Sequence, residues 1–329
     1  MPDRTTRSDD SVFPGTGSEA GAEVAASAGA PSGLAPTGSG ELTTQDDGPP
    51  RSLLSDAWHD LRRRPVFLVS AVLLVFLFVV AAFPGLFTSV DPKFCDLTQS
   101  RGGPVAGHPL GYNKQGCDVY ARMVYGARPS ILVGVLTTIG AVLVGGFVGA
   151  LAGFYGGKID SVLSRLTDVF FAIPLLLGAI VFLQAFQARN VVTVVLALVV
   201  LGWTQIARIM RGAVISVREA DFVLAARALG ASDRRILVRH ILPNSLAPVI
   251  VVASISLGIF IVTEASLSFL GIGLPPETVS GGGDISVAQS SLRTAPRILL
   301  APAGALSLTV LSFILLGDAV REALDPRLR

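Results

Sequence analysis

Apolar residues gather in six long runs that more polar segments separate. Each run is almost free of Asp, Glu, Lys and Arg and comes close to or exceeds the roughly 20 residues that a helix needs to cross a bilayer. The pattern therefore predicts an all-α membrane protein with about six transmembrane helices. An even number of spans places both ends of the chain on one side. The runs cover residues 65–90, 129–157, 166–188, 191–207, 245–270 and 298–317.

The composition agrees with a chain that lipid largely surrounds. Hydrophobic residues make up 51% of the 329 positions and charged residues only 15%, which is too apolar for a soluble domain with a charged surface. The formal net charge is +2, so the charge gives no reason to expect a nucleic-acid partner.

The chain before the first span differs from the rest. Residues 1–50 are mostly small or polar, and this composition predicts a disordered cytoplasmic tail. Residues 51–64 place apolar side chains at helical spacing ahead of three arginines, which is typical of an amphipathic helix at the membrane interface. The expected order continues with a first transmembrane helix at 65–90, an extracytoplasmic loop at 91–128 and a transmembrane domain of five helices at 129–329.

Basic residues near the ends of the spans predict the orientation, because cytoplasmic loops are enriched in Lys and Arg. Arginines precede the first span, Lys158 and Arg165 separate the second from the third, and seven arginines lie within residues 208–239. These regions share one side, so we expect that side, with both termini, to be cytoplasmic. Residues 91–128 also carry basic side chains, which weakens the prediction without reversing it.

The two cysteines, Cys95 and Cys117, both fall in the predicted extracytoplasmic loop. An oxidising compartment allows a disulfide bond to form and persist, so these residues are a candidate pair. Two free thiols are the alternative. Two cysteines are too few for a disulfide-rich scaffold or a zinc site of four thiolates, and we expect no metal site.

The loop between the fourth and fifth spans, residues 218–243, is too long for a simple connector. Residues 220–229 have helical spacing, Gly230 can adopt a left-handed turn, and a second short helix is expected to follow. Such a helix-turn-helix, which we call the knuckle, suits docking into a groove of a soluble partner. A basic loop that only sets the topology is the alternative. The candidate docking residues are Ala225, Ala226, Gly230, Ala231, Asp233, Arg234 and Arg235.

The knuckle resembles the signature coupling loop of binding-protein-dependent ABC importer permeases. That signature is Glu-Ala-Ala, three residues, Gly, nine residues, Ile, one residue and Leu-Pro. Two positions depart from it: Leu224 stands where the family has Glu, and His240 where it has Ile. The first departure removes a charge that the family places toward the ATPase. The matching residues are Ala225, Ala226, Gly230, Leu242 and Pro243.

The resemblance extends over residues 52–329 and is to the C-type membrane subunit of dipeptide and oligopeptide ABC importers. It rests on GHPLGYNKQGCDVYARMVYGARPSILVG at 107–134, on EASLSFLGIGLPP at 264–276 and on the ending LGDAVREALDPRLR. The segment VSGGGDISVAQSS at 279–291 departs from the family, which commonly has a Trp-Gly pair there.

This resemblance implies a type I ABC permease fold and a non-catalytic transport subunit in the cytoplasmic membrane. The sequence contains no GxxxxGK(S/T) phosphate loop, and separate ATPase subunits would bind ATP and Mg²⁺. The implied partners are a homologous B-type permease, two ABC ATPases and an extracytoplasmic peptide-binding protein, with a peptide as cargo. Members of the family also import nickel or other small solutes, and that alternative stays open.

Three ionisable residues fall in or beside the predicted spans, where such groups are costly and often mark functional sites. Asp168 and Arg208 lie toward the cytoplasmic ends of their spans, so an interhelical ion pair or a headgroup contact is favoured over substrate binding. Glu264 lies toward the outer end of the fifth span and is a candidate for the translocation path.

Two other classes of membrane protein fit the sequence less well. An intramembrane hydrolase needs a Ser-His pair, paired Asp residues or a His-Glu metal motif inside the spans. The three histidines, His59, His108 and His240, all lie outside the predicted spans. An ion channel would have a filter-like motif or a ring of charges, and none stands out.

Overall fold

Helices account for nearly all regular structure in the computed structural model, which describes residues 64–186 and 189–324. We find no strand within these ranges, so the all-α prediction is confirmed for them. Five helices are long and apolar enough to cross a membrane. The predictions for residues 1–50 and for nearly all of 51–64 lie outside the described residues. The five helices are α2 (Pro65–Ala82), α3 (Val119–Tyr155), α6 (Val191–Arg218), α9 (Leu242–Phe269) and α11 (Arg297–Leu324).

The third predicted span is two helices rather than one. The axes of α4 (Gly157–Phe171) and α5 (Leu175–Ala185) are bent by 84°, so the prediction of one continuous span over residues 166–188 is wrong. The break follows from Pro174, which has no N–H to donate and which disfavours helical backbone at the residue before it. If the bent pair counts as one span, the described chain has six.

Several helices extend beyond the apolar runs that predicted them. Residues 119–128, assigned from the sequence to the extracytoplasmic loop, belong to α3. The carboxylate of Asp118 starts this helix by accepting a hydrogen bond from the backbone N–H of Ala121 at 2.5 Å. Helices α6 and α11 also continue past their apolar runs. Charged residues end an apolar run without ending a helix, which explains these differences.

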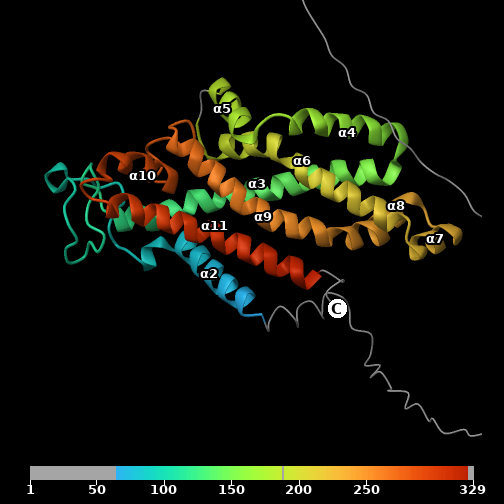
Figure 1. Cartoon of the computed structure of the whole chain (residues 1–329), viewed down its shortest axis with the longest axis horizontal. Helices are drawn as coiled ribbons and strands as arrows, with labels where there is room; N and C mark the ends of the chain where they lie inside the picture. Colours follow the sequence, from blue (N-terminus) through green and yellow to red (C-terminus); the bar gives the residue numbers. More distant parts are fainter. Residues whose placement is uncertain (1–63, 187–188, 325–329) are drawn as a thin grey trace, which may run out of the picture. The chain divides into compact units, whose positions relative to one another are not determined.

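Helices α3 and α6 pack side by side (Figure 1), and a seam of glycines lies between them. Gly145, Gly149 and Gly153 of α3 recur every fourth residue and face the backbone of α6. A Cβ atom at Gly149 would lie 2.3 Å from the carbonyl oxygen of Ala207. The seam is the small-residue packing that brings membrane helices into close contact, and it joins α3 to α6 at the centre of the bundle.

A short helix that the sequence analysis did not predict, α10 (Gly281–Ala288), lies at the same end of the bundle as residues 83–118 (Figure 1). Arg122 of α3 joins the two parts. Its Nε and Nη2 atoms each lie 2.6 Å from Oδ1 of Asp284, and its Nη1 donates to the carbonyl of Pro92 at 3.2 Å. Burial raises the pKa of the Asp284 carboxyl, and the positive charge of Arg122 opposes that shift.

The segment of residues 83–118 is cross-linked within itself. Cys95 and Cys117, 22 residues apart, form a disulfide bond. Beside it, the backbone N–H of Asp96 donates to the carbonyl of Gly116 at 3.1 Å. Cys117 is fully buried whereas Cys95 is exposed, so only one of the two bonded residues is accessible at the surface.

Candidate functional site

The knuckle forms two short helices at the end of the bundle opposite α10 (Figure 1). They are α7 (Asp221–Ala228) and α8 (Asp233–Ile236), and a π-helical turn at Leu237–Ile241 leads from α8 into α9. Gly230 has φ +80°, so the predicted left-handed turn is confirmed. The N–H groups of Gly230 and Ala231 close the turn by donating to the carbonyls of Arg227 and Ala226 at 3.0 and 3.1 Å.

The predicted docking residues lie on or near the surface of the knuckle. Ala226 and Ala231 are half-buried, and the other five are exposed. Two large apolar side chains stand out beside them: Leu224 is 51% exposed and Leu229 is 88% exposed. An apolar surface of this kind next to charged residues is typical of an interaction site. The exposed members of the predicted set are Ala225, Gly230, Asp233, Arg234 and Arg235.

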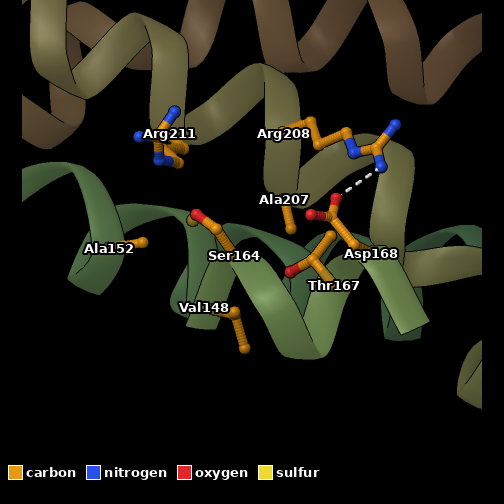
Figure 2. Close-up of a pocket in the computed structure, with 9 residues that line it drawn as sticks. Val148, Ala152, Ser164, Thr167, Asp168, Ala207, Arg208 and Arg211 are labelled. Carbon is orange, nitrogen blue, oxygen red and sulfur yellow. Dashed lines mark hydrogen bonds and ion pairs between the residues drawn. The ribbon is translucent and has the colours of Figure 1, made fainter. Parts of the chain in front are cut away.

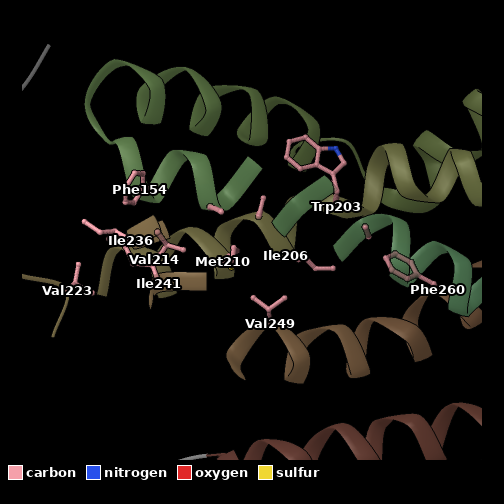
Figure 3. Packing of buried hydrophobic residues seen from close by; sticks show 13 residues of the cluster. Phe154, Trp203, Ile206, Met210, Val214, Val223, Ile236, Ile241, Val249 and Phe260 are labelled. Carbon is pink, nitrogen blue, oxygen red and sulfur yellow. The ribbon is translucent and has the colours of Figure 1, made fainter. Parts of the chain in front are cut away.

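Three buried side chains anchor the knuckle to the spanning helices. Val223, Ile236 and Ile241 are each 0% exposed and belong to a cluster that continues through the bundle. Figure 3 shows them beside Phe154 of α3 and Val214 of α6. A displacement of the knuckle would therefore be passed to α3, α6 and α9, because close-packed interiors transmit strain. The cluster continues through Ile206, Met210, Val249, Trp203 and Phe260.

A cavity of about 420 Å³ lies between α3, α4 and α6 (Figure 2). The residues of α6 that line it belong to the half of that helix nearer the knuckle. Nη2 of Arg208 donates to Oδ1 of Asp168 at 2.7 Å, so the interhelical ion pair favoured from the sequence is present. The guanidinium of Arg208 also lies 3.7 Å from the ring centroid of Phe171. Both members of the pair remain exposed, so the pair borders open space.

A second ion pair between the same helices was not anticipated from the sequence. Nε and Nη2 of Arg211 donate to the two carboxylate oxygens of Asp160 at 2.5 and 2.7 Å. About two turns further along α6, Nη1 of Arg218 donates to the carbonyls of Gly153 and Phe154, each at 3.0 Å. Residues 158–165 lay between two predicted spans, whereas in the structure they belong to α4, which carries both Asp160 and Asp168 toward α6.

Glu264 is inside the subunit rather than on an open face. Its side chain is 0% exposed, and its Oε1 accepts a hydrogen bond from the hydroxyl of Ser268 at 2.7 Å. The same hydroxyl accepts from the backbone N–H of Leu274 at 3.2 Å. The sequence placed this carboxylate as a candidate for the translocation path, whereas its contacts hold together the turn that follows α9.

No group of three or more His, Cys, Asp or Glu side chains is placed to hold a metal ion within residues 64–186 and 189–324. The exposed knuckle, its buried anchors and the ion-paired cavity between α3, α4 and α6 are candidate functional features of the described chain.

Two families of known proteins match this chain. Residues 141–329 match the binding-protein-dependent transport system inner membrane component family. Residues 52–104 match the N-terminal transmembrane domain of oligopeptide transport permease C. The first match includes the knuckle and four of the long helices in whole or in part.

Characterised relatives resemble the chain over most of its length. The oligopeptide transport system permease protein OppC of Bacillus subtilis is 34% identical over 84% of this chain and 91% of its own. The dipeptide transport system permease protein DppC of Alkalihalophilus pseudofirmus is 35% identical over 83% and 90%. The glutathione transport system permease protein GsiD of Pectobacterium atrosepticum is 34% identical over 83% and 90%.

Solved structures show the same fold. A chain in inward-facing structures of the MetNI methionine ABC transporter matches 62% of this chain and 96% of its own length, with a TM-score of 0.53 and 19% sequence identity. A second crystal form of that transporter gives a TM-score of 0.51. The described helices thus adopt the ABC importer permease fold, and the chain belongs to the binding-protein-dependent transport system inner membrane component family.

Proposed function

We propose that this chain is the C-type permease subunit of an ATP-driven ABC importer that carries peptides across the cytoplasmic membrane. The observation that carries the proposal is the knuckle, an exposed helix-turn-helix whose buried residues Val223, Ile236 and Ile241 continue into the core of the spanning helices. Peptide as the cargo is supported by the names of the relatives, which transport oligopeptides, dipeptides and glutathione.

In this proposal the knuckle end is cytoplasmic, with both termini on that side, and α10 and the disulfide lie outside. The chain pairs with a homologous B-type permease to enclose the path. Two ABC ATPases bind ATP and Mg²⁺ beneath them, and an extracytoplasmic binding protein delivers the peptide.

The coupling step follows from the anchors of the knuckle. Closure of the ATPases displaces α7 and α8, and the buried cluster passes that displacement to α6 and α9. Packed helices have discrete arrangements, so the displacement shifts the bundle between two states that open the path to one side and then to the other. The chain itself supplies binding and movement rather than bond chemistry.

Gly230 allows a sharp test, because the space around it is open and only its backbone angle is special. No atom lies within 4 Å of a Cβ built at Gly230, but φ +80° is costly for a β-branched residue and tolerated by Asn. In vesicles that contain the complete complex, we expect Gly230→Val to lower ATP-dependent uptake of labelled di- and oligopeptides while ATPase activity persists. Gly230→Asn is the matched control and should retain uptake.

The two possible failures of this test are separate. Unchanged uptake by the Gly230→Val complex would remove the knuckle from the mechanism. An intact complex that hydrolyses ATP but takes up no peptide would overturn the peptide cargo and leave the knuckle untouched.

A further inference from the structure

The break between α4 and α5 lies at mid-depth of the bundle and is exposed. Phe171, Ile173 and Pro174 are exposed in the isolated chain, and they line a pocket together with Gly202 from the middle of α6 and Ile259 from α9. Helix ends carry backbone N–H and C=O groups without intrahelical partners. Irregular backbone at this depth is tolerated only where protein covers it or where it lines a water-filled cavity. The break therefore does not face lipid.

Polar side chains without partners meet at the same place. The pocket has a volume of about 200 Å³, and Thr204, Gln205 and Ser256 line it. Within the described ranges, none of these three side chains has a hydrogen-bond partner. Gln205 is exposed in the middle of a spanning helix. A free amide at that depth is costly in hydrocarbon, so the pocket is suited to a ligand or solvent that forms hydrogen bonds.

The exposed side of α6 changes along its length. Toward the α10 end, Val192, Leu196 and Val200 are exposed, and this apolar stripe suits lipid. Toward the knuckle, the exposed residues include Gln205 and Arg208. Gln205 lies nine residues after Leu196, which is about two and a half helical turns, so the two side chains leave opposite sides of α6. The polar side is the one that carries the break.

The pocket lies next to the larger cavity nearer the knuckle, and one side-chain contact separates the two. Phe171 lines the pocket, and the guanidinium of Arg208, which lines the larger cavity, lies over its ring at 3.7 Å. The contact between Phe171 and Arg208 therefore lies between the two hollows. The two hollows follow one another along α6 from mid-depth toward the knuckle, and we call this succession the track.

We infer that this track, from the α4–α5 break past Gln205 to the Arg208–Asp168 pair, is the part of the peptide path that this chain contributes. The inference rests on the proposed function and adds residues to it. The lining of the pocket is neutral and can donate and accept hydrogen bonds, and Arg208 is balanced by Asp168. A track of this chemistry binds the backbone amides of a peptide rather than one kind of charged side chain.

Cross-linking from two positions of α6 tests the inference. Benzoylphenylalanine is introduced at Gln205 or, as the matched control, at the exposed residue Leu196 on the opposite side of the same helix. The complete complex in vesicles is illuminated during ATP-driven uptake of a labelled peptide. We expect labelled peptide to be attached at position 205 and not at position 196.

Other outcomes overturn the inference. Attachment at position 205 to the second permease subunit alone would make this surface a subunit interface, and attachment to lipid alone would make it part of the outer wall. Uptake by the unmodified complex is measured first, so that failure of the peptide cargo is seen separately from failure of the path.

A kinetic variant checks the same inference without a bulky probe. Gln205→Leu removes the amide and keeps a similar size, so we expect the KM of peptide uptake to rise about threefold to tenfold, the effect of losing one neutral hydrogen bond. Leu196→Ala should leave the KM unchanged. An unchanged KM in the Gln205→Leu complex would overturn binding by this side chain.

Discussion

Glu264 acts, in this structure, on its own helix and on the turn after it. Its Oε1 accepts a hydrogen bond from the hydroxyl of Ser268, and that hydroxyl accepts one from the backbone N–H of Leu274. The turn leads from α9 toward α10, and Gly282 of α10 packs so closely on Ala265 that a Cβ would lie 2.3 Å from the Ala265 carbonyl oxygen. One buried side chain thus fixes the course of the chain at the α10 end of the bundle.

Replacing Glu264 by Gln and by Leu separates this positioning role from a role in the path. Gln keeps an oxygen that accepts from Ser268, so we expect uptake and thermal stability close to those of the unmodified complex. Leu leaves the Ser268 hydroxyl without its buried acceptor, which costs about 1–3 kcal/mol. Thermal unfolding of the purified complex measures this difference. If the Glu264→Gln complex lost uptake while its stability stayed unchanged, the hypothesis that the Glu264 carboxylate lines the translocation path would be supported instead.

Single residues differed in how far the sequence could place them. The Asp168–Arg208 pair could be favoured because both groups sit near the same end of their spans, where isolated charges need partners. The burial of Glu264 could not be foreseen, because its neighbour Ser268 and the N–H of Leu274 come together only once the turn has formed. The exposure of Gln205 depends on the break between α4 and α5, so it could not be predicted from the sequence either.

At the scale of helices, the packing of α3 against α6 depends on which glycines have no room for a side chain. Gly146 is next to Gly145 on α3, yet no atom lies within 4 Å of a Cβ built there. Gly149, one turn along the seam, would place its Cβ against the backbone of Ala207. The two positions have the same residue type on the same helix and differ only in their surroundings. A substitution at one can therefore serve as the control for the same substitution at the other.

Gly149→Ala should therefore destabilise the chain and Gly146→Ala should not. The added methyl group at Gly149 forces α3 and α6 apart, and overpacking of this kind costs about 1–3 kcal/mol. At Gly146 the same change removes a residue with poor helix propensity and stabilises the helix by at most about 1 kcal/mol. The melting temperatures of the two purified complexes measure this difference in stability. Equal melting temperatures would mean that the seam is not tightly packed.

The existence of the helices followed from apolar runs, and their limits did not. Hydropathy locates the part of a helix that lies in lipid, whereas α6 continues beyond it into charged residues that still form helix. The break at Pro174 was hidden because the residues on both sides are apolar. Helix α10 was missed since it is short and starts with glycines, and Ser280, whose hydroxyl accepts from the N–H of Gly283 at 3.2 Å, begins it.

At the scale of the whole molecule, every functional statement depends on which end faces the cytoplasm. The knuckle can meet a cytoplasmic ATPase only if the opposite end, with α10 and the disulfide, lies outside. The distribution of basic residues did not predict this orientation clearly, because residues 91–128, on the proposed outer side, also carry positive charge. Part of that charge now has a structural role: Arg122 is neutralised by Asp284 at 2.6 Å, so it weighs less against the proposed orientation.

The two cysteines allow the orientation to be measured directly, because the chain has no others. A membrane-impermeant maleimide added to intact cells should label nothing while the Cys95–Cys117 bond is closed. After treatment with a membrane-impermeant reductant, the exposed Cys95 should be labelled in intact cells. The double variant Cys95→Ser/Cys117→Ser is the control for background labelling.

The alternative orientation gives the opposite pattern and has a wider consequence. Labelling that requires inverted membrane vesicles would place the disulfide loop in the cytoplasm and the knuckle outside. The knuckle would then be unable to reach an ATPase, and the coupling proposal would fail together with the orientation. Labelling of intact cells without reduction would instead show free thiols, and the external loop would lose the cross-link that restrains its unfolded chain by roughly 3 kcal/mol.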